Sequence, residues 1–199
     1  MPGPLPRFSV LHLWMALELI RTHGRVGRKQ LARMMKIGEG SARTILERLA
    51  GLGLVRPMRG GSSLTGKGLR VLEALPRVVG VDLSYLSLAK KSAVAVVPGA
   101  ARLVSSGIEQ RDAAVRAGGR GATVLIFRNG RLRFPDGLEV EREAEKIVSL
   151  VEPSENDVVL IGFGDDGVSA RLAAMAAVIS LLPPKILKEL GGHGPAAGG

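Results

Sequence analysis

The chain has 199 residues, of which 46% are hydrophobic and 23% charged, and its formal net charge at pH 7 is +10. This length is sufficient for two small domains. The lack of cysteine excludes disulfides, cysteine-based zinc sites and thiol catalysis, and it agrees with a reducing, cytoplasmic location. Arginine outnumbers lysine by 20 to 8, a balance that favours a thermophilic source.

The sequence has only weak indications of a metal site, a signal peptide or a membrane-spanning helix. The three histidines, His12, His23 and His193, are too scattered for a metal cluster, so we expect neither a metal nor a cofactor. The start of the chain lacks the charged region and apolar run of a signal peptide. The apolar stretch Leu172–Leu182 is shorter than the roughly 20 residues that cross a bilayer, so we expect no membrane partner.

The positive charge is concentrated in the first third of the chain. Residues 1–76 hold 13 Lys and Arg against 4 Asp and Glu, whereas residues 77–199 hold 15 against 14. A basic segment beside a near-neutral one indicates two functions, of which the first involves a polyanion.

Helical spacing of apolar residues predicts three helices, a short hairpin and a fourth helix in residues 1–76. The expected helices cover 9–23, 28–36, 42–52 and 66–75, and the expected hairpin has strands at 54–56 and Leu64 with its tip at 59–61. Ser9, Ser41 and Thr65 are the expected N-caps of the first, third and fourth helices. This order is typical of a winged helix-turn-helix domain.

In a helix-turn-helix, the second helix enters the major groove of DNA, and here that helix is 42–52. Arg43 and Thr44 are expected in its first turn, where side chains reach base edges, and arginine is the commonest bidentate partner of guanine. Ser41 and the free N–H groups beside it can bind a phosphate. The residues predicted to contact DNA are Arg28, Lys29, Ser41, Arg43, Thr44, Glu47, Arg48, Arg56, Arg59 and Lys67.

Residues 10–75 resemble the winged helix-turn-helix domains of archaeal and bacterial transcription regulators. The resemblance rests on four segments, Gly27 to Ala32, Ser41 to Leu49, Gly51 to Val55 and Leu64 to Gly68. It implies a DNA-binding regulator. Winged helices also serve as protein-docking modules, so docking remains the alternative.

Strands and helices alternate after Pro76. Strands are expected over 78–84, 93–97, 122–127, 132–134 and 157–163, and helices over 140–151 and 168–182, with a mainly helical or irregular stretch over 100–117. The nearly continuous apolar strand 157–163 indicates burial on both faces. The dipeptide Asn129-Gly130 indicates a hairpin. We therefore predict an α+β protein of two domains, the winged helix at 1–76 and a mixed α/β domain at 77–190, followed by a disordered tail at 191–199.

Two segments of the second domain are candidate ligand sites. Gln110, Arg111 and Asp112 are neighbouring polar residues, and Arg111 can hold a carboxylate or phosphate, or else form a local ion pair that stabilises a helix. The turn Gly164-Asp165-Asp166 joins a strand to a helix, a common ligand position in α/β domains. Because its carboxylates oppose phosphate unless a metal intervenes, we favour a capping role there.

The second domain is also similar to a domain of unknown function found in archaea behind a winged helix. The resemblance rests on Gly107 to Ala114, Gly121 to Thr123, and Val158 to Gly162 with the Asp-Asp loop. It implies a two-part regulator and no established chemistry.

The leading hypothesis is a transcription regulator that binds double-stranded DNA as a homodimer, with a second domain that senses a small-molecule effector, dimerises, or does both. One alternative is a protein-docking component of a transcription or replication assembly. Another is an enzyme that handles a nucleotide or phosphorylated metabolite. That enzyme would need a closed pocket joining Arg111 to Asp165 and Asp166 with a metal. No catalytic residue is predicted.

Overall fold

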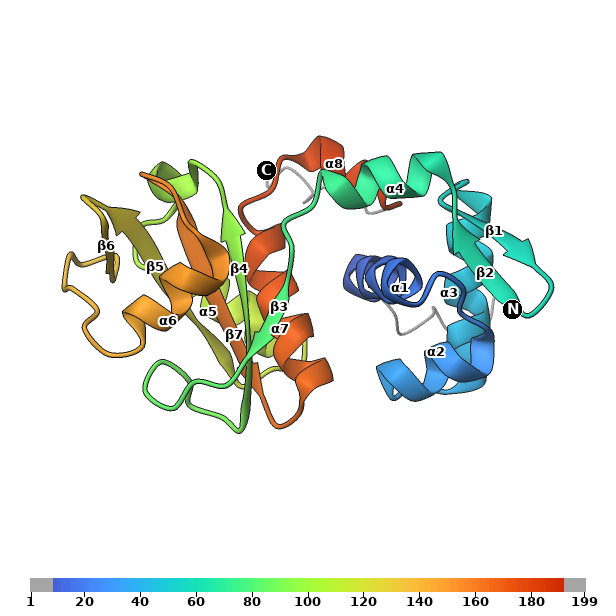
Figure 1. Ribbon diagram of the computed structural model, residues 1–199, viewed down its shortest axis with the longest axis horizontal. Coiled ribbons are helices and arrows are strands. Elements are labelled where there is room, and N and C mark those ends of the chain that lie inside the picture. Colours follow the sequence, from blue (N-terminus) through green and yellow to red (C-terminus); the bar gives the residue numbers. More distant parts are fainter. Residues whose placement is uncertain (1–8, 192–199) are drawn as a thin grey trace, which may run out of the picture. The chain divides into compact units, whose positions relative to one another are not determined.

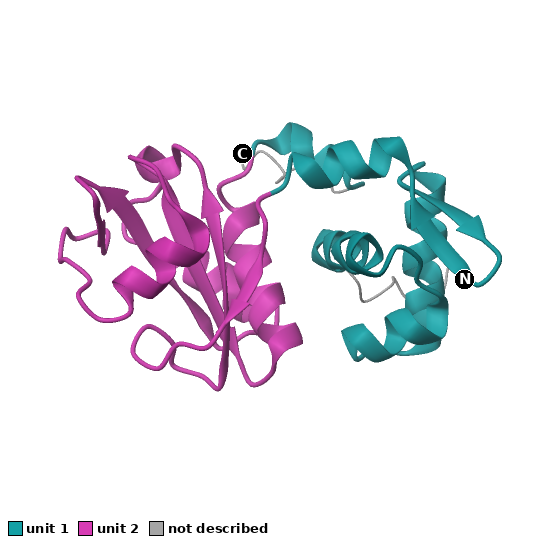
Figure 2. Ribbon diagram, in the orientation of Figure 1, with its two compact units in different colours: residues 1–75, 183–199 teal, residues 76–182 magenta. Residues whose placement is uncertain are grey.

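The structure, a computed structural model, describes residues 9–191. The chain divides into two compact units, shown in different colours in Figure 2. Unit 1 comprises residues 1–75 and 183–199, and unit 2 comprises residues 76–182. The expected second domain extends to residue 190, whereas residues 183–190 group with unit 1. Apart from Gly191, the expected tail lies outside the described residues.

Unit 1 has the element order of a winged helix-turn-helix, with one further helix from the end of the chain (Figure 1). Its elements are α1 (Val10–His23), α2 (Arg28–Met35), α3 (Glu39–Gly51), β1 (Val55–Met58), β2 (Gly61–Leu64), α4 (Gly66–Glu73) and α8 (Pro184–Glu189). The side chains of Leu13, Leu17, Ile45 and Leu49 are fully buried, as their helical spacing predicts. Trp14 is also fully buried, and its indole N–H has no partner among the described residues.

Helix α3 begins three residues before the predicted start. Gly38 is its N-cap and contributes no side-chain hydrogen bond, so the prediction that Ser41 is the N-cap is wrong. Ser41 instead occupies the first turn, together with Glu39. The two glycines at 38 and 40 suggested a turn, but glycine at 40 is accommodated inside the helix. Arg43 and Thr44 consequently lie in the second turn.

The hairpin of β1 and β2 is tied to the loop before α2. Val26 and Ser62 exchange two backbone hydrogen bonds of 3.0 and 2.9 Å, which adds a third short strand contact to the hairpin. Gly61 has φ +149°, and a Cβ there would lie 2.7 Å from the Val26 carbonyl carbon. The close approach therefore requires glycine. At the base of the hairpin, Thr65 caps α4 by accepting a hydrogen bond from the Gly68 amide at 3.0 Å, as predicted.

Unit 2 is built on a five-stranded, entirely antiparallel sheet. Its elements are β3 (Val79–Val81), β4 (Lys91–Val97), the 3-10 helix η1 (Ala100–Leu103), α5 (Ile108–Arg116), β5 (Gly121–Arg128), β6 (Arg131–Arg133), α6 (Ala144–Val151), β7 (Val158–Gly164) and α7 (Gly167–Ile179). The strand order is β3-β4-β7-β5-β6. The predicted α+β class is confirmed.

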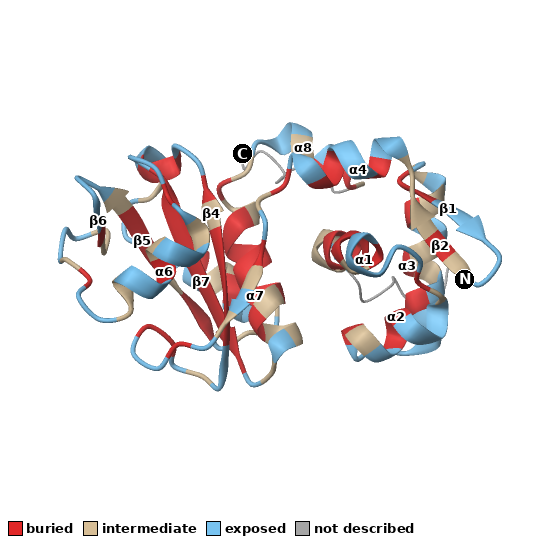
Figure 3. Cartoon of the chain, in the orientation of Figure 1, coloured by how far each residue is buried: buried red, intermediate tan, exposed pale blue. Residues whose placement is uncertain are grey.

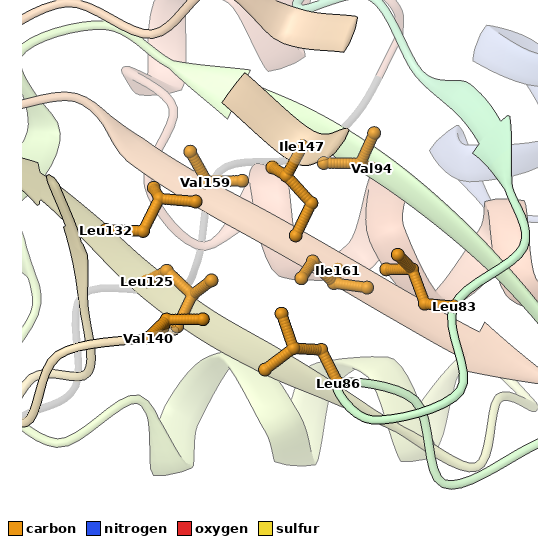
Figure 4. Close-up of a cluster of buried hydrophobic side chains, with 9 residues drawn as sticks. All are labelled: Leu83, Leu86, Val94, Leu125, Leu132, Val140, Ile147, Val159 and Ile161. Atoms are coloured by element: carbon orange, nitrogen blue, oxygen red, sulfur yellow. The ribbon is translucent and has the colours of Figure 1, made fainter. Parts of the chain in front are cut away.

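The central strand β7 is buried along its whole length, as its apolar sequence predicts (Figure 3). Its residues alternate between two cores. Val159 and Ile161 pack with Ile147 of α6 and with Val94 of β4 (Figure 4). On the opposite face α7 lies so close to β7 that a Cβ on Gly162 would lie 2.6 Å from the Cα of Ala174. Helix α5 packs beside α7 and against β5.

Two elements of unit 2 are shorter than predicted. Strand β3 covers only 79–81, because the chain then turns to bury Leu83 and Leu86 over the sheet. Helix α6 begins at Ala144 rather than at 140, because residues 138–140 pair with β6 and its continuation: the Val140 amide donates to the Leu132 carbonyl at 2.9 Å. The predicted hairpin at Asn129-Gly130 is confirmed, with φ of +52° and +75° at its two central residues.

Candidate nucleic-acid interface

Helices α2 and α3 pack together through a short turn and form the helix-turn-helix of unit 1. Lys36 ends α2 in a left-handed conformation with φ +55°, and the chain enters α3 two residues later. Ala42, Ile45 and Leu49 anchor α3 in the core of the unit. The opposite side of α3 presents Arg43 and Glu47 to solvent.

Three of the predicted DNA contacts on the helix-turn-helix, Arg28, Arg43 and Glu47, take part in loose ion pairs. Arg43 Nε lies 3.6 Å from a carboxylate oxygen of Glu47, one helical turn away, and Arg28 Nε lies 3.7 Å from Glu39. The side chains of all four residues are more than half exposed. Exposed pairs of this kind contribute little to stability, about 0–1 kcal/mol, so both guanidinium groups can exchange these partners for a polyanion.

The remaining residues near the start of α3 have smaller roles. Thr44 is half-buried and its hydroxyl donates to the Gly40 carbonyl at 3.0 Å, within the helix. Ser41 is exposed in the first turn, where amide N–H groups are free of intrahelical partners. Glu39 already places a carboxylate in that turn, and this carboxylate would oppose the phosphate that we predicted at Ser41.

The wing, residues 55–64, carries Arg56 and Arg59 on its exposed side. Among the described residues, no acidic side chain lies within ion-pair distance of Arg59 in the wing or of Lys29 at the start of α2. Arg56 Nε lies 3.5 Å from the Ser63 hydroxyl across the hairpin. These three cations are therefore available to solvent and to an anionic partner.

Arg25, in the loop between α1 and α2, contacts the wing, and the sequence-based prediction missed it. Its guanidinium Nη1 donates to the Arg59 carbonyl at 2.9 Å, 34 residues away along the chain. Together with the bridge between Val26 and Ser62, this bond holds the wing tip to the loop between α1 and α2. Arg25 stands three residues before the basic pair at the start of α2, but no local pattern connects it with the wing.

Two further predicted DNA contacts have partners inside unit 1. The Lys67 ammonium donates to the Leu52 carbonyl at 2.8 Å, where it neutralises the negative end of α3. An Nη2 hydrogen bond of 2.6 Å joins Arg48 to the Gly191 carbonyl in the last described part of the chain. Both side chains remain exposed, but each already stabilises a contact at the carboxyl end of α3.

In unit 2 the structure separates the three residues of the first candidate ligand site. Gln110 is 2% exposed, and its side-chain amide donates to the Ser180 hydroxyl at 2.9 Å, so it joins α5 to the end of α7. Arg111 and Asp112 form an exposed ion pair of 3.3 Å on the surface of α5. Arg111 also lines a cavity of about 270 Å³ with Ile108 and Thr123, which does not include the second candidate site.

In the second candidate ligand site, Gly164-Asp165-Asp166, both carboxylates have structural roles. Asp166 is the N-cap of α7 and accepts from the amides of Val168 and Ser169, both at 2.9 Å, the capping role that the sequence favours. Asp165 receives a bidentate bond from Arg120, with Nη2 at 2.8 Å, and this bond lowers the pKa of the Asp165 carboxyl. Because the sheet is antiparallel, the analogy with ligand-binding turns of parallel sheets does not apply.

Unit 2 contains an internal carboxylate site that the sequence did not predict. Glu143, in a left-handed conformation with φ +64°, accepts hydrogen bonds of 2.7–3.0 Å from the backbone amides of Ser84, Tyr85 and Leu86. Burial raises the pKa of Glu143, but these donors outweigh it, so the pKa lies below its ordinary value. The contact holds a loop 59 residues away along the chain.

Within residues 9–191, no group of three or more His, Asp or Glu side chains is arranged to hold a metal ion. The described helices also include none with the length and apolar character needed to cross a membrane.

Comparison with known proteins agrees with the division into two units. Residues 15–70, within unit 1, match the family model described as "PH0730-like, N-terminal domain". Residues 88–181, within unit 2, match a domain of unknown function, DUF4443. A search of the curated proteins finds no match.

The fold as a whole resembles a solved structure, that of the hypothetical protein PH0730 from Pyrococcus horikoshii OT3. The TM-score is 0.75 with 24% sequence identity, and the match covers 92% of this chain and 100% of that one. At this identity the likeness establishes the fold alone. The similarity that we inferred to an archaeal protein with a domain of unknown function is therefore supported, while no named relative assigns a function.

Proposed function

We propose that this protein is a transcription regulator that binds double-stranded DNA through unit 1. The observation that carries the proposal is the set of exposed cations on the helix-turn-helix and the wing, which have loose ion pairs or none among the described residues. Its members are Arg28, Lys29, Arg43, Arg56 and Arg59. They belong to the two parts of a winged helix that approach a duplex, whereas the charges of unit 2 nearly balance.

The contacts divide into two kinds in this proposal. Arg43 projects from the exposed side of α3 and reads a base edge in the major groove. Lys29, Arg56 and Arg59 bind phosphates, which positions the protein and provides affinity without sequence preference. Arg25 stiffens the wing that carries Arg59, because its bond to the Arg59 carbonyl limits the movement of the tip.

Unit 2 provides dimerisation, effector binding, or both, in this proposal. Two adjoining cavities of about 270 and 470 Å³ share Ser106, Phe134 and Pro135. Their walls include the exposed Ile108 and Leu138, an apolar surface of the kind used for partners or ligands. A homodimer would double the contacted DNA and raise specificity through two half-sites.

Selection of bound duplexes from a random pool tests the proposal. We expect a common sequence to be enriched, and we expect affinity for it to fall steeply with salt, with a log–log slope of about −3 for the three phosphate contacts of one protomer and about −5 for a homodimer. Fluorescence anisotropy titrations with the selected and a scrambled duplex measure both quantities. No binding at micromolar protein in low salt would contradict the proposal and favour protein docking instead.

A further inference from the structure

The end of the described chain returns to unit 1 and contacts α3. Residues 183–191, which we call the C-terminal latch, comprise Pro183, helix α8 and the turn at Leu190 and Gly191. Two of its apolar side chains are buried, Leu187 at 6% and Leu190 at 0% exposure. The latch is therefore part of the packed structure of unit 1, although about 110 residues of unit 2 separate it from α4.

The latch contacts α3 through a hydrogen bond from Arg48 and through close packing of Gly191. Arg48 donates to the Gly191 carbonyl at 2.6 Å, a charge-assisted hydrogen bond. Gly191 has φ +71°, and a Cβ at that position would lie 3.1 Å from Leu52 Cδ1 and 3.5 Å from Arg48 Nη2. A larger residue at 191 would therefore be strained by the positive φ and would have to displace the Leu52 side chain.

The latch is joined closely to the central helix of unit 2. Helix α7 packs along β7 and β4 and ends at Ile179, four residues before Pro183. The Ser180 hydroxyl receives the Gln110 bond that holds the end of α7 to α5. The two prolines at 183 and 184 restrict the backbone where the latch begins.

We propose that the C-terminal latch positions α3 within unit 1, and that Arg48 is a positioning residue that anchors the latch rather than a phosphate contact. The contact itself does not depend on DNA binding. Its consequence for how α3 meets a duplex rests on the proposed function.

Hydrogen exchange of the full-length, DNA-free protein tests the contact. We compare Arg48→Ala, Gly191→Val and the double variant with wild type, and use Arg33→Ala as a control that removes one exposed cation from the same unit. Loss of one charge-assisted bond predicts exchange about tenfold faster in peptides covering 184–191 and 49–54 for either single variant. The double variant should be no faster than the singles, because both remove the same contact. Wild-type exchange rates in the single variants, additive effects, or an equal effect of Arg33→Ala would overturn the anchoring role.

DNA titrations distinguish the two roles of Arg48. If Arg48 positions α3, then Arg48→Ala and Gly191→Val weaken binding to the same extent and leave the salt slope unchanged. A slope that becomes shallower by about 0.9 in Arg48→Ala alone would identify a phosphate contact and overturn the positioning role. If wild type binds no DNA, the proposed function fails, whereas the exchange experiment still decides whether the latch exists.

Discussion

The two units use their charged side chains differently. In unit 1 the ion pairs of Arg28 and Arg43 exceed 3.5 Å, and Lys29 and Arg59 have no acidic partner among the described residues. In unit 2, Arg120 forms a bidentate bond with Asp165, and Glu143 accepts hydrogen bonds from three backbone amides. These charged residues of unit 2 thus hold distant segments together, whereas Arg28, Lys29, Arg43 and Arg59 of unit 1 leave their charged groups accessible to a partner. Local clustering of polar residues did not distinguish the two cases.

Among the substitutions considered, Gly162→Ala is expected to produce the largest difference in stability between the two units. The added methyl would overlap the backbone of Ala174 in α7, which neither β7 nor α7 can relieve by a side-chain movement. We expect a loss of about 3 kcal/mol or more in the stability of unit 2. Far-UV circular dichroism should report this loss. Fluorescence of the single tryptophan, Trp14 in unit 1, should keep its wild-type transition.

Gly130→Ala is the matched control for the glycine substitution. Nothing lies within 4 Å of a Cβ at Gly130, but its φ of +75° is unfavourable for alanine. The cost should be only about 1–2 kcal/mol. Equal destabilisation by both variants would show that the contact between α7 and β7 is looser than the structure indicates.

A second, intermediate effect is expected from Arg43→Ala on DNA affinity. If Arg43 reads a base edge, its removal costs about 1–3 kcal/mol, or roughly five- to a hundredfold in affinity for the selected sequence. Preference at one position should relax at the same time. Anisotropy titrations with matched and mismatched duplexes measure both changes.

Arg111→Ala provides the comparison in unit 2, because it removes an equally exposed arginine from α5. We expect the DNA affinity of this variant to stay within about twofold of wild type, since an exposed charge outside the DNA-binding unit contributes only screened electrostatics. If both variants lost affinity equally, the assignment of DNA binding to unit 1 would fail.

The smallest effect is expected from Glu143→Gln. The folded-state pKa of Glu143 is lowered, so its stabilising contribution is present above the unfolded pKa and is lost as the pH falls through the folded value. Glutamine should therefore cost about 0.5–1.5 kcal/mol at pH 7, and the difference from wild type should shrink below about pH 4.3. Urea unfolding followed by circular dichroism at several pH values measures this. A difference that is independent of pH would mean that the carboxylate charge is not involved.

Local signals in the sequence predicted much of the fold. Thr65 and Asp166 cap helices as expected, because capping involves residues only two or three positions apart. The Asn129-Gly130 turn and the buried strand β7 are local patterns of the same kind. The start of α3 was misplaced because glycine usually marks a turn, and the cost of Gly40 inside a helix is only about 1 kcal/mol.

Contacts between distant residues could not be predicted. Gln110 bonds to a residue 70 positions away, Arg25 to one 34 away and Arg48 to one 143 away. Each looks like an ordinary polar residue of its own helix or loop. Their partners depend on how helices and loops pack in the folded chain, and the antiparallel arrangement of the sheet likewise follows from pairing that no single segment encodes.

Unit 1 consists of two separate segments of the chain, and this affects the order in which its parts are synthesised. A ribosome synthesises residues 1–75 before unit 2 and the latch after it. Unit 2 is therefore synthesised in full, and can fold, before the latch exists. Until then, the helix-turn-helix of a nascent chain lacks the contact between Arg48 and Gly191. The packing around the carboxyl end of α3 is in this way completed only after unit 2 has been made.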